Sequence, residues 1–161
     1  IPFLGICLGM QCAAVEFARN VLNLEGAAST EVKPESPHPV IDLMPEQQQV
    51  QKMGGTMRLG SYACELRRNS QASKAYHSLK VYERHRHRYE FNNDYKEAFE
   101  KKGMTPSGIN PESGLVEILE MKSHPWFVGV QFHPELKSTV ENPHPLFVSL
   151  VKACMAYKSG R

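Results

Sequence analysis

Residues 2–11 read PFLGICLGMQ, an apolar run that places Cys7 between Gly5 and Gly9. The part before the cysteine is short and apolar, which is typical of a buried strand of a parallel sheet. The part after it continues to residue 21 with apolar side chains at helical spacing. A strand, a tight glycine turn and a helix make one βα unit. The stretch therefore predicts an α/β fold, with residues 1–6 buried on both faces of the sheet.

The rest of the chain predicts further strands and helices around a β-rich middle. The expected elements are strands at 115–119 and 127–132, a helix at 95–102 ending at Gly103, and a helix that begins at Pro145. The stretch MGGTMRLG at 53–60 predicts a glycine turn into a strand of an antiparallel excursion. Residues 27–45 are rich in proline and small polar residues and are expected to form a loop.

Length and composition favour one globular domain of ordinary type. The chain has 161 residues, of which 41% are hydrophobic and 22% charged, and its formal net charge is +2. This charge indicates neither a nucleic-acid binder nor a membrane-surface protein. No apolar run approaches the ~20 residues of a transmembrane helix, and the first ten residues lack the basic leader of a signal peptide.

The cysteines indicate the redox compartment. Cys7, Cys12, Cys64 and Cys154 lie far apart, and the sequence has no CxxC pair. Such spacing favours reduced thiols over a disulfide framework. We therefore expect a cytoplasmic protein.

Cys7 has two interpretations. Most cysteines are buried small hydrophobic residues, but a core cysteine needs no glycines around it. A side chain at a strand-to-helix corner projects from the sheet edge, as in the nucleophile elbow of hydrolases. The start of the following helix offers free N–H groups that stabilise a thiolate. We therefore expect Cys7 to be the one exposed, activated cysteine and a nucleophile.

A cysteine nucleophile needs a base, and one histidine lies in a suitable place. His133 and Glu135 follow the predicted strand at 127–132, at the sheet edge where catalytic residues of α/β folds gather. Residues two apart in an extended chain share a face, so the Glu135 carboxylate can orient the His133 imidazole. An HPE turn without a role is the alternative.

Residues 84–88 read RHRHR, the densest basic run in the chain. A nucleic-acid patch would need greater length and interleaved aromatic side chains. A metal site would need carboxylate or thiolate partners near the two histidines. We therefore expect a solvated basic strand and no metal. A single arginine of this run could still clamp a substrate carboxylate.

Taken together, Cys7, His133 and Glu135 resemble the class I glutamine amidotransferases, whose signatures are a GxCxG elbow and a late HPE. Five stretches narrow the resemblance to the glutaminase domain of the CTP synthases: GICLGMQ, Ser29-Thr30-Glu31, MGGTMRLG, ERHRHRYEFN and HPWFVGVQFHPE. The resemblance runs from the first residue almost to the last. It implies a flavodoxin-like α/β domain, partial over residues 1–161, with a mainly parallel sheet flanked by helices and a small β insertion.

The resemblance also implies catalytic roles. Cys7 matches the nucleophile, His133 its base and Glu135 the residue that orients the base. Leu8 matches the residue whose backbone N–H helps to form the oxyanion hole. The implied reaction is hydrolysis of L-glutamine through a cysteine thioester, with release of ammonia.

The positions that match glutamine-binding residues of the family are Leu8, Gln11, Glu31 and Arg88. Glu31 suits the ammonium group of the substrate, and Arg88 suits its carboxylate. Both substrate charges need such partners because burying an unpaired charge is costly.

The resemblance implies partners outside this chain. Ammonia would pass to an amidoligase domain of the same enzyme, which aminates UTP to CTP with ATP and Mg²⁺. No cofactor is expected in this chain, which has no GxxxxGK[ST] phosphate loop. The full enzyme is expected to be a homo-oligomer.

The resemblance places several strands and a glycine-rich oxyanion loop before the elbow. We therefore expect residues 1–161 to be the later part of a glutaminase domain, poorly soluble and weakly active when expressed alone. Other class I amidotransferases, such as the glutaminases of GMP synthetase, carbamoyl phosphate synthetase or anthranilate synthase, remain alternatives. So do a γ-glutamyl thiol hydrolase, which would not need MGGTMRLG or RHRHRYE, and a non-catalytic fragment.

Overall fold

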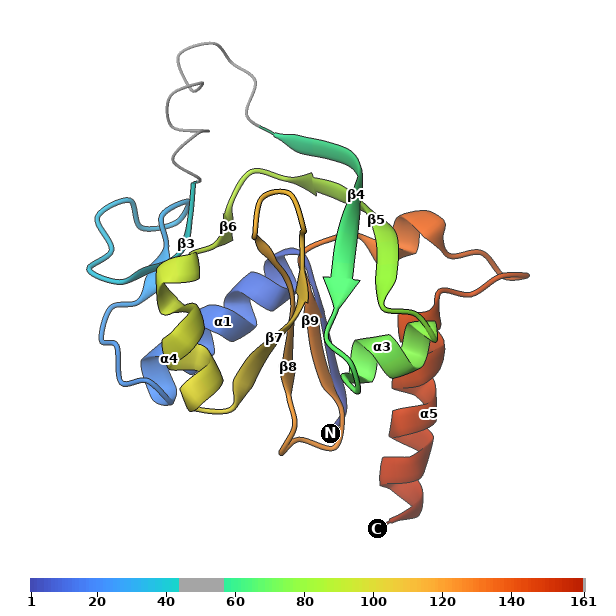
Figure 1. Cartoon of the computed structure of the whole chain (residues 1–161). Coiled ribbons are helices and arrows are strands. Elements are labelled where there is room, and N and C mark those ends of the chain that lie inside the picture. The colour runs from blue at the N-terminus through green and yellow to red at the C-terminus, as the bar shows by residue number, and fades with distance from the viewer. Residues whose placement is uncertain (44–56, 161) are drawn as a thin grey trace.

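The computed structural model describes residues 1–43 and 57–160. The strands are β1 (Phe3–Ile6), β2 (Ala28–Ser29), β3 (Pro39–Asp42), β4 (Arg58–Leu66), β5 (Lys80–His87), β6 (Glu90–Phe91), β7 (Met104–Ile109), β8 (Val116–Met121) and β9 (Phe127–Val130). The helices are α1 (Leu8–Asn20), α3 (Gln71–Tyr76), α4 (Lys96–Lys101) and α5 (Pro145–Ser159), with 3₁₀ turns η2 (Asn93–Tyr95) and η3 (Pro134–Lys137). Figure 1 shows their arrangement.

A six-stranded sheet in the order β1-β9-β8-β7-β4-β5 forms the centre of the molecule (Figure 1). Strands β1 and β9 pair in parallel, whereas the other neighbours in this sheet pair antiparallel. The α/β class is confirmed, but the expectation of a mainly parallel sheet was wrong for the described residues. Neighbours such as β7 and β8 follow each other directly in the chain, and a short connection can only reverse the strand direction.

Two apolar clusters fill the space on the two sides of this sheet. Helices α1 and α4 contribute Met10, Phe17 and Phe99 to the first cluster. Helices α3 and α5 contribute Ala72 and Leu146 to the second. The small sheet β2-β3-β6 lies beside α1 and packs against the first cluster through Val40, Ile41 and Phe91. This layering holds the ends of β1 and β9 in fixed positions.

Several expected elements are confirmed, and some are not. The last helix begins at Pro145, and Gly103 follows α4 with a positive φ of 99°. Residues 27–45 were expected to be a loop, but they contain β2 and β3, which pair with each other in parallel. Strand β4 pairs antiparallel with β5, as expected for the excursion, while residues 53–56 of its predicted turn lie outside the described residues.

Strand β1 is less buried than expected. Phe3, Leu4 and Ile6 are half-buried, and only Gly5 is fully buried within the strand. Strand β1 pairs with β9 on one edge, and no described strand pairs with its other edge. The expectation that residues 1–6 are buried on both faces was therefore wrong for the described part of the chain.

The turn from β1 into α1 is as tight as the glycines predict, but only one of them is required by space. A Cβ atom on Gly5 would lie 2.8 Å from the backbone carbon of Gly9, whereas a Cβ on Gly9 would meet nothing within 4 Å. Strand and helix therefore touch at Gly5. Cys7 itself has φ 49° and ψ −105°, a region that L-residues avoid and that occurs mainly at functional sites.

We expect Gly5→Ala to lower the free energy of unfolding by about 1–3 kcal/mol, because backbone atoms cannot move aside for the new methyl group. Gly9→Ala is the matched control. It adds a methyl group in open space on a helix and is expected to stabilise by about 0.5–1 kcal/mol. Urea unfolding followed by the fluorescence of Trp126, the single tryptophan of the sequence, measures both changes. Equal effects of the two substitutions would contradict the close contact.

Candidate active site

The ends of β1 and β9 bring the predicted nucleophile and base to one edge of the sheet. Ile6 pairs with Val130 at the last register position, and the Cys7 backbone N–H donates to the Val130 carbonyl at 2.7 Å. His133 follows three residues after Val130, and its N–H donates to the Arg84 carbonyl of β5 at 2.8 Å. Strand β5 therefore borders the site.

His133 and Glu135 interact as the sequence predicts. His133 Nδ1 lies 2.6 Å from Glu135 Oε1 in a hydrogen bond that fixes the ring orientation. His133 Nε2 is buried and has no hydrogen-bond partner among the described residues. That nitrogen is therefore free to exchange a proton with a bound molecule. No hydrogen bond joins it to Cys7 Sγ within the described part of the chain.

Cys7 differs from the expectation of a uniquely exposed cysteine. It is half-buried, whereas Cys12 and Cys154 are exposed and Cys64 is buried. All four cysteines are free thiols. Exposure is therefore not what distinguishes Cys7. Its position at the corner and its strained backbone do.

The environment of Cys7 sets two influences on its acidity against each other. Burial raises the pKa of the thiol, and the charges of Glu135, Glu90 and Glu31 raise it further. A hydrogen bond from the backbone of Leu8 lowers it, as expected at the start of a helix. The net pKa is raised, so the expectation of a thiolate activated by the helix alone was wrong.

Two glutamine side chains lie against Cys7, and sequence reasoning missed one of them. Gln131 is fully buried, and its Nε2 lies 3.7 Å from Cys7 Sγ. Gln11 Nε2 donates to Gln131 Oε1 at 3.2 Å and to the Tyr89 carbonyl at 3.0 Å. Gln131 stands two residues before His133, so the shared face of an extended chain was the signal that could have found it.

The other positions expected to bind glutamine lie around the same edge. Glu31 is exposed, and its charge acts on Cys7, which places it on the side of the thiol. Leu8 has an exposed side chain and directs its backbone N–H at the thiol. Arg88 is exposed one residue after β5 ends. The amide nitrogen of Gln11 is already bonded to protein groups, which leaves its oxygen and its backbone for other partners.

The basic run at 84–88 is not a solvated strand throughout. Its arginines are exposed, but His85 and His87 are only 2% and 6% exposed. Their rings bond to each other at 2.8 Å, and burial is the main reason why their pKa values fall to about 2 and about 3. Strand alternation therefore separates two kinds of residue that look alike in the sequence.

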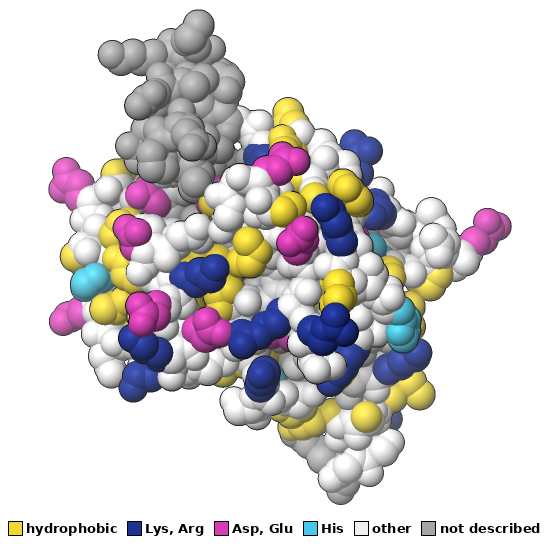
Figure 2. Space-filling model, viewed as in Figure 1, with side chains coloured by type: hydrophobic (Ala, Val, Ile, Leu, Met, Phe, Trp, Pro, Cys, Tyr) yellow, Lys and Arg dark blue, Asp and Glu magenta, His cyan; other side chains and the backbone are white. Residues whose placement is uncertain are grey.

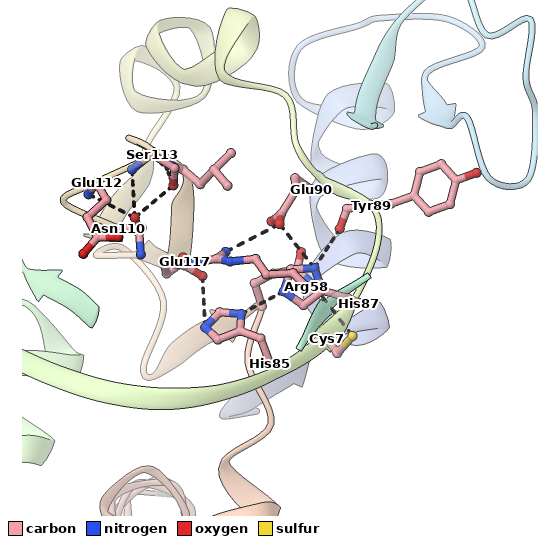
Figure 3. Close-up of polar contacts among 12 residues, drawn as sticks. Cys7, Arg58, His85, His87, Tyr89, Glu90, Asn110, Glu112, Ser113 and Glu117 are labelled. Atoms are coloured by element: carbon pink, nitrogen blue, oxygen red, sulfur yellow. Dashed lines mark hydrogen bonds and ion pairs between the residues drawn. The ribbon is translucent and has the colours of Figure 1, made fainter. Parts of the chain in front are cut away.

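These neutral histidines lie in a buried polar cluster whose single described cation is Arg58 (Figure 3). Arg58 Nη2 lies 2.6 Å from Glu117 Oε1, and Arg58 Nη1 lies 3.5 Å from Glu90 Oε1. Burial raises the pKa of Glu90 to about 8, although Arg58 lowers it. One cation thus faces two carboxylates. Glu117 is the closer partner, and Glu90 is the group that more readily holds a proton.

Away from this edge, a cavity of about 600 Å³ opens beside α3. Arg67, Arg68, Lys74 and Lys122 line it, together with Trp126. Figure 2 shows Lys and Arg side chains spread over the lower half of the face that carries α3. Cys7 and His133 do not line this cavity.

Within residues 1–43 and 57–160, no helix has the length and apolar character needed to span a bilayer. The same residues contain no group of three or more His, Cys, Asp or Glu side chains that could hold a metal ion.

Comparison with known families agrees with this geometry. Residues 1–153 match the family Glutamine amidotransferase class-I. The chain belongs to this family. The region matched includes Cys7, His133 and Glu135, so the family resemblance read from these motifs is confirmed.

Curated relatives refine the resemblance. CTP synthase of Cytophaga hutchinsonii is 60% identical over 161 residues, which make up 100% of this chain and 30% of that protein. CTP synthase of Christiangramia forsetii is 64% identical over 153 residues, 95% of this chain and 28% of that protein. CTP synthase of Clostridium kluyveri is 60% identical over 158 residues, 98% and 29% respectively. The chain thus spans less than a third of the length of these relatives.

Solved structures agree. The glutaminase domain of Trypanosoma brucei CTPS with bound acivicin matches with a TM-score of 0.91 and 39% identity, over 97% of this chain and 61% of that chain. A putative GMP synthase protein from Thermoplasma acidophilum matches with a TM-score of 0.62 and 18% identity, over 98% and 59%. The second likeness shows a shared fold only.

Proposed function

We propose that this chain is the glutaminase part of a CTP synthase and that it hydrolyses L-glutamine to supply ammonia. The observation that carries the proposal is the placement of a strained Cys7 beside the His133–Glu135 pair, at the adjoining ends of β1 and β9. The identities of 60–64% to CTP synthases support this choice among glutaminases. The glutaminase domain of Trypanosoma brucei was solved with acivicin, a glutamine analogue, which also supports it.

In the proposed mechanism, the Cys7 thiol gives its proton to His133, and the sulfur attacks the side-chain amide carbon of glutamine. Glu135 stabilises the imidazolium that forms. The Leu8 N–H donates to the developing oxyanion. Because Nε2 of His133 is the ring nitrogen without a partner among the described residues, the proton passes through it.

Collapse of the tetrahedral intermediate breaks the C–N bond. His133 returns its proton to the leaving nitrogen, so ammonia departs and a glutamyl thioester remains on Cys7. A water molecule then gives a proton to His133 and attacks the thioester carbon. The C–S bond breaks, glutamate leaves, and the thiol recovers the proton.

The substrate termini need opposite charges, and the site offers both. We assign Glu31 to the substrate ammonium and Arg88 to the substrate carboxylate. Both side chains are exposed without a described partner, so both are available to a ligand. Gln11 is assigned to the same pocket through its remaining oxygen or its backbone.

The proposal for the whole enzyme goes further. Ammonia released at Cys7 would pass to an amidoligase domain, where UTP is aminated to CTP with ATP and Mg²⁺. No residue of this chain is assigned to ATP or Mg²⁺. A cytoplasmic location and a homo-oligomeric assembly are parts of the same proposal, as is the division of the enzyme that makes residues 1–161 the later part of a glutaminase domain.

Arg88 offers a test. We expect Arg88→Ala to raise the KM for L-glutamine about 10- to 100-fold, because it removes a charged partner of the substrate. Arg84→Ala is the control, since Arg84 is equally exposed on the same run. The measurement is ammonia release from L-glutamine by the complete protein. Equal effects at both positions would reduce Arg88 to general surface charge, and no release by the unmodified protein would overturn the proposed function.

A further inference from the structure

Gln131 occupies the space between Cys7 and the interior of the domain. Its side chain is 0% exposed, although a glutamine seldom lies wholly within a core. Its Nε2 donates toward Cys7 Sγ at 3.7 Å, and its Oε1 accepts from Gln11 Nε2 at 3.2 Å. Both ends of the buried amide are therefore engaged, one of them with the sulfur.

The direction of these bonds has a single anchor. The Tyr89 carbonyl can only accept hydrogen bonds, so Gln11 must present its NH₂ group there, at 3.0 Å. The same nitrogen donates its second hydrogen to Gln131, which must then present its oxygen to Gln11. Gln131 is left with its NH₂ group toward Cys7. If either amide were reversed, two donors or two acceptors would face each other inside the protein.

We propose that Gln131 is a positioning residue that holds the Cys7 sulfur in place and favours its thiolate, and that Gln11 and the Tyr89 carbonyl set its orientation. The proposal rests on the proposed role of Cys7 as the nucleophile. It adds to that role a second donor on the sulfur beside the Leu8 N–H. A neutral amide suits this place because it supplies a donor without adding a charge to the core.

The charged groups around Cys7 explain why such a donor is needed. Glu31 after β2, Glu90 of β6 and Glu135 of η3 all oppose a negative sulfur, and burial does so more strongly. His133 after β9 is the neighbouring base. Hydrogen bonds to the charged form of a group favour that form. Gln131 and Leu8 thus act against four influences that disfavour the thiolate.

The test is the pH dependence of Cys7 alkylation by iodoacetamide in the complete protein, measured by site-resolved mass spectrometry. We expect Gln131→Met, which keeps the volume and removes the donor, to raise the pH midpoint by about one unit, so that alkylation below the midpoint slows about 10-fold. Gln11→Met should shift the midpoint the same way by less, because it removes the anchor and not the donor. Gln131→Glu should shift it further, because it places a charge beside the sulfur.

Two other cysteines serve as controls. Exposed Cys154 should keep its own profile in every variant, and buried Cys64 should stay protected wherever the protein is folded. If Gln131→Met exposes Cys64, Gln11→Met decides the matter by the same readout. An unchanged Cys7 midpoint in a folded variant overturns the proposal. Because alkylation needs no glutamine turnover, this outcome is distinct from failure of the proposed glutaminase activity.

Discussion

Replacing Cys7 with alanine is expected to lower glutamine-dependent ammonia release by about 10⁴-fold or more, because no other group can form the thioester. The proposed mechanism uses the thiol in both half-reactions, so no partial route remains. Ammonia-dependent formation of CTP by the complete protein is expected to persist, since free ammonia bypasses the thiol. The measurement is therefore a pair of assays on one variant, one with glutamine and one with an ammonium salt.

Cys12→Ala is the matched control for this prediction. Cys12 lies on the same helix five residues later and is more exposed than Cys7. It is expected to leave both assays unchanged, because exposure without the corner geometry gives no catalytic role. Loss of ammonia-dependent activity in Cys7→Ala would instead indicate a structural role for the thiol. Comparable loss of glutamine-dependent activity in both variants would remove the distinction on which the site is built.

Local signals were sufficient to predict the corner and the pair. The βα turn at Cys7 depends on neighbours in sequence, such as Gly5, and the His133–Glu135 bond joins residues two apart. Both therefore leave a pattern within a few residues. The parallel pairing of β1 with β9 follows from the same expectation that catalytic groups collect at one sheet edge.

Long-range partnerships left no such pattern. Nothing near Gln131 in the sequence indicates that Gln11, 120 positions earlier, lies against it. The strand directions were also misjudged, because apolar runs look alike in parallel and antiparallel sheets when both faces are covered. In the run at 84–88 the alternation was visible, but charge suggested solvent. The buried carboxylates that accompany His85 and His87 lie on other strands.

That buried cluster carries the largest expected effect on stability. Replacing Arg58 with methionine should lower the free energy of unfolding by about 3–5 kcal/mol, because it removes the cation shared by two carboxylates. The Glu90 and Glu117 side chains are 1% and 0% exposed, so water cannot replace the guanidinium. Methionine keeps much of the side-chain volume, which separates the loss of charge from the loss of packing.

Arg67→Met is the control, with the same change of residue type. Arg67 pairs with Glu100 at 2.5 Å, closer than Arg58 to either partner, but the two side chains are 48% and 45% exposed. Solvent screens such a pair, so the expected loss is at most about 1 kcal/mol. Burial, and not distance, is thus expected to decide which pair stabilises the fold. Urea unfolding at neutral pH, followed by Trp126 fluorescence, measures both variants.

A double variant separates charge from shape. Arg58→Met combined with Glu117→Gln removes the cation together with its closest carboxylate, so no unpaired charge remains at Glu117. It is expected to be more stable than Arg58→Met alone, since an isolated buried charge costs more than the pair contributes. If the double variant is instead the less stable of the two, the cluster stabilises the protein through its hydrogen bonds and packing. If Arg58→Met and Arg67→Met lose the same small free energy, Glu117 is not held by Arg58 at all.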